Sequence, residues 1–138
     1  MSIFSKIFGD SEHKDSQHQR INWQLLTEMQ QVGHLISESF DKPVFIFKHS
    51  TKCAISRMAL KQFESHYNID EGAVDPYFLD LLNYREISNE IADRLEVTHQ
   101  SPQLILVKSG KCIYTSSHSD IDAEELEEKL SEKTKHPL

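Results

Sequence analysis

The sequence predicts an α/β fold in which a central mixed β-sheet is flanked by helices. Short apolar segments rich in β-branched and aromatic residues alternate with helical patterns along most of the 138-residue chain. This alternation predicts parallel strands joined by right-handed crossovers, and a late hairpin adds an antiparallel edge. The expected order is β-α-β-α-β-α-β-β-α. We expect one domain, residues 22–138, behind a flexible polar leader, residues 1–21.

The first strand and the first helix are expected directly after the leader. Trp23 to Leu26 has the composition of a short strand. Thr27 and Gln30 have the spacing of a capping box, in which two side chains bond the free N–H groups of a helix start. The helix is therefore expected to begin at Thr27 and to end before Pro43.

The most informative segment runs from Pro43 to Tyr67. Val44 to Phe47 is a short apolar run that predicts a buried strand. A polar turn and Cys53 follow, and then apolar residues recur every three or four positions, as on one face of a helix. The predicted apolar face consists of Ile55, Met58, Ala59, Phe63 and Tyr67. Cys53 is therefore expected where this helix begins.

A helix start favours the thiolate form of a cysteine. The first turn of a helix presents free N–H groups and the positive end of the macrodipole, and Lys52 adds a neighbouring cation. A free thiol titrates near about 8.5, and such surroundings lower this value to roughly 3.5 to 7.5. We therefore expect Cys53 to be a nucleophile. The alternative is that Cys53 is a small buried hydrophobic side chain.

The second cysteine is expected to be structural. Leu104 to Val107 and Cys112 to Tyr114 are two strand patterns joined by a turn that contains Gly110, which predicts a hairpin. Its register places Cys112 opposite Val107, roughly 16 Å along the sheet from the expected site at about 3.3 Å per residue. An acidic-to-basic helix from Asp120 to Lys133 is expected to end the fold.

Composition argues against several classes of partner. A formal charge of −7, a pI near 5.6 and the lack of long basic runs argue against nucleic acid and membrane surfaces as partners. Met1 to Gly9 lacks the features of a signal peptide, so we expect a cytoplasmic protein whose cysteines are thiols. No His or Cys pair has the spacing of a closed metal site, and we predict no metal.

Several motifs carry a family resemblance. A strand followed by Cys-x-x-Ser at a helix start, with a Ser-Pro pair before a later strand, resembles the thioredoxin and glutaredoxin superfamily. The chain is more closely similar to the monothiol bacilliredoxin family of the YtxJ type, thioredoxin-like proteins linked to bacillithiol. The matching stretches are Phe47 to Thr51, Cys53, Ile55-Ser56, Tyr84-Arg85, Ile87 to Asn89, Ile91-Ala92, Val97, His99, Ser101 to Gln103 and Ser117-His118.

The chain departs from the family pattern at three positions. The family core is commonly Thr-Cys-Pro-Ile-Ser, whereas Lys52 precedes the cysteine and Ala54 follows it here. Gln100 stands where the family usually has Glu after its His. Proline at the first helical position stiffens the turn, so Ala54 should leave the site slightly looser.

The resemblance implies a thioredoxin-like fold and a thiol–disulfide oxidoreductase. The enzyme would remove bacillithiol or a similar small thiol from oxidised client proteins, with no tightly bound cofactor. Ser56 replaces the second cysteine of dithiol enzymes, and its hydroxyl can donate to the sulfur but cannot attack it. The residues expected to act are Cys53 as nucleophile, Ser56 as helper, and Thr51, Lys52, His99, Ser101 and Pro102 around the substrate, with a cis Ser101–Pro102 bond.

Two other functions remain open from the sequence. One is a redox-inert binding module that uses the same groove. The other is a carrier of an iron–sulfur cluster shared between two subunits, as in some monothiol glutaredoxins. Those proteins have Gly-Phe between the cysteine and the serine, where this chain has Ala54-Ile55.

Overall fold

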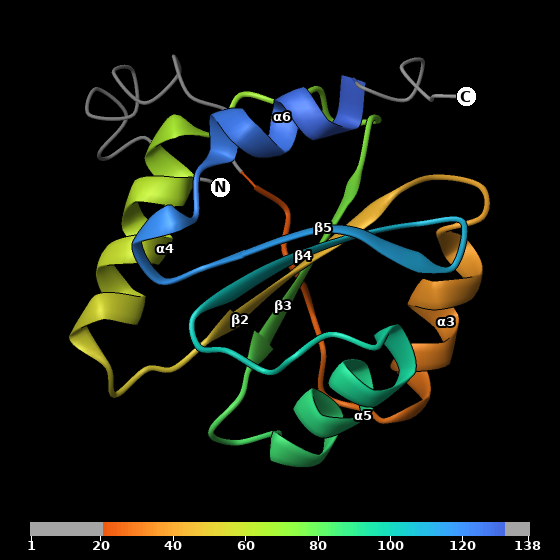
Figure 1. Ribbon diagram of the computed structural model, residues 1–138, viewed down its shortest axis with the longest axis horizontal. Helices are drawn as coiled ribbons and strands as arrows, with labels where there is room; N and C mark the ends of the chain where they lie inside the picture. The colour runs from red at the N-terminus through yellow and green to blue at the C-terminus, as the bar shows by residue number, and fades with distance from the viewer. Residues whose placement is uncertain (1–20, 132–138) are drawn as a thin grey trace, which may run out of the picture.

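A five-stranded sheet lies at the centre of the computed structural model, which describes residues 21–131 (Figure 1). The strands are β1 (Gln24–Leu25), β2 (Val44–His49), β3 (Asp75–Asp80), β4 (Gln103–Lys108) and β5 (Lys111–Ser117). The described helices are α3 (Gln30–Glu38), α4 (Ala54–His66), α5 (Arg85–Leu95), the short 3-10 helix η1 (His118–Asp120) and α6 (Ala123–Ser131). This is the predicted order with η1 added. The predicted leader lies, except for its last residue, outside the described residues.

The sheet is mixed, with strand order β1-β3-β2-β4-β5. β3 runs parallel to both of its neighbours, β1 and β2. β4 runs antiparallel to β2 and to β5. The predicted α/β fold with a central mixed sheet is therefore confirmed, and β2 is its middle strand.

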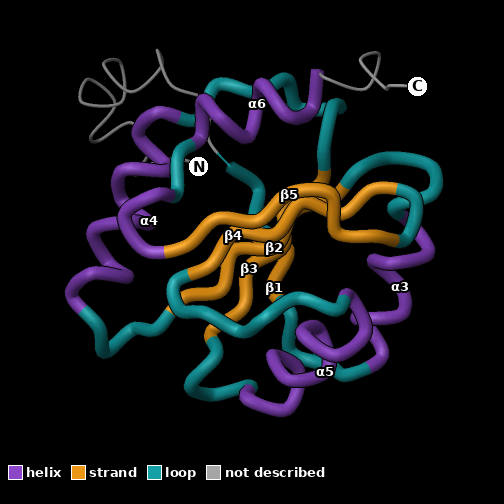
Figure 2. Tube along the Cα trace, viewed as in Figure 1, coloured by secondary structure: helices purple, strands orange, loops and turns teal. Residues whose placement is uncertain are grey.

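Helices cover both faces of the sheet (Figure 2): α4 and α6 lie on one face, and α3 and α5 on the other. β2 contributes to both cores because alternate side chains of a strand point to opposite faces. Val44 and Ile46 pack in the core on the α3 and α5 face, and Phe45 and Phe47 in the core on the α4 and α6 face. All four are fully buried, which stabilises the fold by about 1.5 to 3 kcal/mol each. The strand that leads to Cys53 is therefore firmly anchored.

Trp23 connects the start of the fold to α4. Its ring meets Phe45 and Phe78 edge-on, with centroid distances of 5.7 and 5.3 Å. Its Nε1–H donates to Glu64 Oε2 of α4 at 2.8 Å. This partly buried aromatic cluster and the bond to Glu64 fix α4 against the sheet.

Helix α3 begins three residues later than predicted, and the predicted capping box is wrong. The residue before its first turn is Met29, which makes no side-chain cap. The amide oxygen of Gln31 instead accepts hydrogen bonds from the N–H groups of Thr27 and Glu28, each at 2.8 Å. The side chain that satisfies these donors therefore lies one position beyond the one predicted.

Two residues predicted to face the core from α4 are exposed instead. Ile55 is 56% exposed and Met58 is 63% exposed, whereas Ser56 and Phe63 are buried. The three-and-four spacing identifies a helix, but packing decides how the helix is rotated about its axis. In the first turn the inward position is taken by Ser56, whose hydroxyl finds bonding partners there.

The β4–β5 hairpin turns through Ser109 and Gly110, which have φ angles of 53° and 80°. Such paired positive φ angles are typical of a tight hairpin turn. Cys112 pairs with Val107 as predicted, and Val107 pairs with Val44 at the start of β2. Cys112 therefore lies near the end of β2 that is remote from Cys53.

Candidate active site

Cys53 lies between β2 and α4, at the N-cap of the helix. Its backbone is extended, with φ of −111° and ψ of 123°. Its N–H donates to the Ser50 carbonyl at 3.2 Å, and its own carbonyl accepts the Arg57 N–H at 3.1 Å. The side chain is half-buried and forms no disulfide. The predicted position of Cys53, where the helix begins, is confirmed.

The hydroxyl of Ser56 is buried beneath the turn before Cys53. It accepts the Ser50 N–H at 3.0 Å and lies 2.8 Å from His49 Nδ1. The hydroxyl proton is not used in the bond from Ser50, so Ser56 can donate it to His49 when Nδ1 carries no proton. Among residues 21–131, no hydrogen bond joins Ser56 to the Cys53 sulfur. The hydroxyl therefore stabilises the turn, rather than making the predicted bond to the sulfur.

His49, at the end of β2, is suited to accept that proton. Its side chain is buried, and burial is the main cause that lowers its pKa; the Arg57 charge adds to this effect, and the Asp80 charge opposes it. A neutral imidazole leaves one ring nitrogen as an acceptor. The partner of His49 is Ser56, so this bond joins the end of β2 to the first turn of α4.

The turn itself is exposed at Thr51 and Lys52. The guanidinium of Arg57 donates to the Thr51 carbonyl at 3.0 Å, which connects the turn to the first helical turn. Thr51 and Lys52 therefore flank Cys53 on the solvent side, where a bound substrate could contact them.

The Ser101–Pro102 segment reaches the same edge of the sheet from β4. β4 is antiparallel to β2, and Gln103 pairs with Lys48 near the end of β2. The Ser101–Pro102 peptide bond is cis, as the resemblance implies. The Pro102 carbonyl accepts the His118 N–H at 3.1 Å, so the start of η1 also lies at this edge.

His99 lies beside Lys48, a residue that is part of no site predicted from the sequence. The Lys48 side chain is fully buried, and its Nζ lies 3.1 Å from His99 Nδ1. Ser88 Oγ of α5 is 3.4 Å from the same ring nitrogen. One sequence signal could have identified Lys48: it directly follows the apolar run Val44 to Phe47, at a position that alternation places on the same face as Val44 and Ile46.

This edge of the sheet brings together a single thiol, a cis-proline segment and a group of basic side chains. Comparison with known proteins identifies the arrangement. Residues 24–126, which are most of the chain, match the model of the family described as "Monothiol bacilliredoxin BrxC". The chain belongs to this family. Membership and fold together support a thiol oxidoreductase role for this bacilliredoxin.

Solved structures agree on the fold. A protein described as a candidate oxidoreductase with a thioredoxin fold is 33% identical, with a TM-score of 0.64 over 75% of this chain and 89% of that chain. Thioredoxin from Malassezia sympodialis is 22% identical, with a TM-score of 0.63 over 82% and 91%. Thioredoxin O2 from Arabidopsis thaliana is 19% identical, with a TM-score of 0.61 over 83% and 96%. The bacilliredoxin therefore has the predicted thioredoxin-like fold.

Two further observations on the described chain concern membranes and metal ions. None of the helices within residues 21–131 is both long enough and apolar enough to cross a membrane. Within the same residues, no three His, Cys, Asp or Glu side chains are grouped as ligands of a metal ion would be. The roles of Cys53 and its neighbours in a reaction stay predictions.

Proposed function

We propose that this bacilliredoxin removes bacillithiol, or a similar small thiol, from mixed disulfides on client proteins in the cytoplasm. The observation that carries the proposal is the position of Cys53, which is half-buried at the N-cap of α4, beside the turn Ser50 to Lys52. Both cysteines are free thiols, which suits a reducing compartment. A lone thiol at a helix start is suited to exchange with a disulfide.

The reaction needs two exchange steps. The Cys53 thiolate attacks the sulfur of the small thiol in the client mixed disulfide, forms a Cys53–small-thiol disulfide and releases the client as a thiolate. A second molecule of the small thiol, as its thiolate, then attacks the sulfur of the small thiol bound to Cys53. This step releases the symmetrical disulfide of the small thiol and regenerates the Cys53 thiolate.

The thiol that attacks in the second step must come from outside the protein, because no thiol within the protein is suitably placed. Cys112 pairs with Val107 near the far end of β2. Ser56 occupies the position of a resolving cysteine, but its hydroxyl is buried and bonded to His49. A serine hydroxyl in addition lacks the nucleophilic strength of a thiolate. An external small thiol therefore completes the cycle in this proposal.

Two single variants and a model client test the proposal. A single-cysteine client carrying bacillithiol in a mixed disulfide is mixed with excess bacillithiol, and its release is followed by mass spectrometry. Cys53→Ser should abolish catalysed release, whereas Cys112→Ser, the matched control, should retain it. Release by Cys53→Ser at the rate of the unmodified protein would overturn the proposal. The intact mass of Cys112→Ser under turnover should show the small thiol on Cys53.

A further inference from the structure

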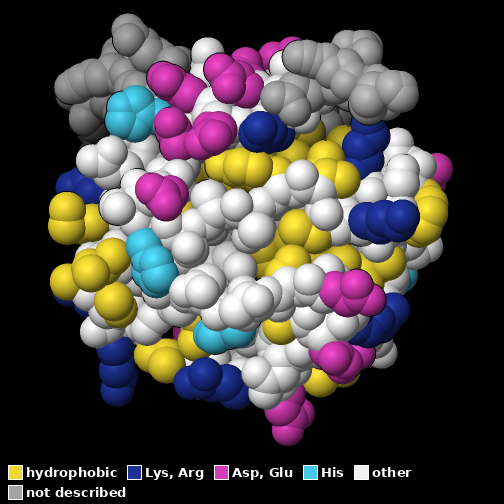
Figure 3. Space-filling model, viewed as in Figure 1, with side chains coloured by type: hydrophobic (Ala, Val, Ile, Leu, Met, Phe, Trp, Pro, Cys, Tyr) yellow, Lys and Arg dark blue, Asp and Glu magenta, His cyan; other side chains and the backbone are white. Residues whose placement is uncertain are grey.

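Basic side chains gather on the α5 side of the active-site edge. Lys48 is the last residue of β2 on the face that also carries Val44 and Ile46. Arg85 is the first residue of α5, and His99 lies in the segment before Pro102. Since β2 and β3 end at this edge and β4 begins there, the three residues share the edge that carries Cys53. Figure 3 shows basic and histidine side chains at the lower left of the view, where these strands end, while acidic side chains gather over α6 at the top.

The buried lysine of this group has no carboxylate partner. Residues 21–131 contain two ion pairs, Lys42–Asp75 and Arg94–Glu90, so Lys48, Arg85 and His99 all lack an acidic partner there. Burying a charged ammonium group without a counter-charge is costly. A chain with a net charge of −7 has many carboxylates with which it could have compensated this charge.

Hydrogen bonding orients the exposed histidine. The Lys48 ammonium donates to His99 Nδ1 at 3.1 Å, so the other ring nitrogen, Nε2, carries the proton and remains a donor. Burial, the Lys48 charge and the Arg85 charge all lower the pKa of His99, which keeps the ring neutral. His99 and Arg85 are exposed, so both can contact a ligand while Lys48 supports them from below.

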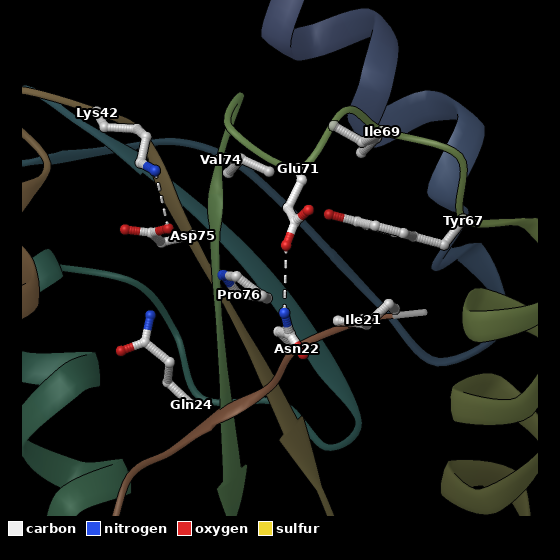
Figure 4. A pocket seen from close by; sticks show the side chains of 10 residues that line it. All are labelled: Ile21, Asn22, Gln24, Lys42, Tyr67, Ile69, Glu71, Val74, Asp75 and Pro76. Atoms are coloured by element: carbon white, nitrogen blue, oxygen red, sulfur yellow. Dashed lines mark hydrogen bonds and ion pairs between the residues drawn. The ribbon is translucent and has the colours of Figure 1, made fainter. Parts of the chain in front are cut away.

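A cavity elsewhere in the molecule shows a different arrangement of charged side chains (Figure 4). It lies at the opposite end of the sheet, where β2 and β3 begin, and its volume is about 650 Å³. Charged and polar groups that line it are paired with one another: Lys42 with Asp75 at 3.1 Å, and Asn22 with Glu71 at 3.3 Å. At the Cys53 edge the carboxylate of Asp80 lies beside His49, at the end of β3. No ion pair among residues 21–131 joins a carboxylate to Lys48, Arg85 or His99.

We infer that Arg85 and His99, supported by Lys48, bind a carboxylate of the small thiol, so that the preferred substrates are mixed disulfides of anionic thiols. This inference rests on the proposed function and specifies its substrate class. A carboxylate at this position accepts charge-assisted hydrogen bonds from the Arg85 guanidinium and a bond from His99 Nε2–H. The carboxylate also supplies a counter-charge for the buried ammonium group of Lys48. The sulfur of the same small molecule is then held on the α5 side of Cys53.

A pair of matched adducts tests the inference. One single-cysteine client is prepared as its mixed disulfide with mercaptopropionate and, separately, with mercaptopropionamide, which has the same shape without the charge. Because the client is constant, any preference for acidic client residues cancels in the ratio of kcat/KM values. We expect the carboxylate adduct to react about tenfold more efficiently, which corresponds to about 1.4 kcal/mol. Added salt should reduce the ratio, since exposed charges are screened.

Single variants test which side chains cause the preference for the carboxylate adduct. Arg85→Gln and His99→Asn change exposed side chains and should each reduce the preference to about threefold or less. Arg94→Gln removes the same charge from the other end of α5 and should leave the preference unchanged. Lys48→Met should also reduce it; circular dichroism checks that this buried variant is folded, and the two exposed variants decide the question if it is not.

Two outcomes would overturn the inference: equal rates for the two adducts in the unmodified protein, or a preference that persists undiminished in Arg85→Gln and His99→Asn. The amide adduct separates this failure from failure of the proposed function. If it is released through Cys53 but no charge preference exists, only the inference fails. If Cys53 releases neither adduct, the proposed function fails and the inference fails with it.

Discussion

The two cysteines of the chain have the same thiol group but opposite surroundings. Cys53 lies at a junction between strand and helix, on an edge where basic side chains gather. Cys112 lies within β5, packs against the core on the α3 and α5 face and donates from its Sγ to the Tyr114 carbonyl at 3.6 Å. Burial raises the pKa of Cys112, an effect that this hydrogen bond partly offsets. Reactivity therefore depends on where the fold places each sulfur.

The same contrast applies to the two ends of the sheet. At the Cys53 end, β2 finishes in Lys48 and His49, two buried polar side chains whose bonding partners are other site residues. At the Cys112 end, the hairpin turn packs against the ring of Phe40. Substitutions at the first end should therefore change chemistry as well as stability, and substitutions at the second should change stability alone.

The largest expected effect is a difference in alkylation rate between the two thiols. In the native protein, iodoacetamide at neutral pH should modify Cys53 on the order of 100-fold faster than Cys112, because burial raises the pKa of Cys112 and a neutral thiol is a poor nucleophile. Peptide mass spectrometry of timed samples measures both rates. In denaturant the two rates should converge. Equal rates in the native protein would contradict the contrast between the two cysteines.

The next effect concerns the buried cation at the Cys53 end. Burial lowers the pKa of Lys48 from 10.5 to about 8. Between these values the unfolded chain binds more protons than the native protein, so the free energy of unfolding gains a contribution that rises with pH. The pKa of His99 is lowered from 6.5, so this ring is already neutral in this range and does not mask the effect. Below about pH 8 the buried charge is a full cost to the native state.

The substitution Lys48→Met removes this pH-dependent contribution to the free energy of unfolding. We expect the variant to be more stable than the unmodified protein at pH 7, and we expect the difference to narrow by about 3 kcal/mol as the pH rises from about 8 to 10.5. Urea unfolding of both proteins at a series of pH values measures the difference. A difference that is constant with pH would show that Lys48 titrates normally, and would remove one reason for seeking an anionic ligand.

A smaller effect is expected at Ser56. Ser56→Ala leaves the Ser50 N–H and His49 Nδ1 without their partner, at a cost of about 2 kcal/mol in the free energy of unfolding. Ser65→Ala is a matched control in the same helix, since its hydroxyl is exposed and bonds only neighbouring groups; it should cost a few tenths of a kcal/mol. Urea unfolding measures both. Equal costs would mean that Ser56 does not stabilise the turn before Cys53.

Local sequence patterns predicted most of the fold. The apolar run at Val44, the three-and-four spacing of α4 and the glycine of the β4–β5 turn each report on neighbouring residues, and each element formed where expected. The register of Cys112 followed from the length of the hairpin turn alone. The predicted start of α3 was wrong because two neighbouring glutamine side chains, Gln30 and Gln31, could each have accepted hydrogen bonds from the free N–H groups, and Gln31 does so.

The site was less predictable because its contacts join distant parts of the chain. Lys48 and His99 are 51 residues apart, and no local pattern reports that one side chain meets the other. A lysine at a strand end is ordinarily read as a solvated residue, so its burial appears only once α5 covers that face. Ile55 and Met58 were placed in the core because spacing does not fix the rotation of a helix.

The smallest effect tests the hairpin end. Gly110 has a φ of 80°, and a Cβ there would lie 2.6 Å from the Phe40 ring, which is exposed and able to move aside. Gly110→Ala should therefore cost about 1 kcal/mol, mainly from the left-handed backbone. Gly72→Ala is the control, since a Cβ there meets nothing within 4 Å. Turnover through Cys53 should be unchanged in both variants, because Gly110 lies beyond Cys112 at the far end of the sheet. A loss of turnover in folded Gly110→Ala would show that the two ends of the sheet are coupled.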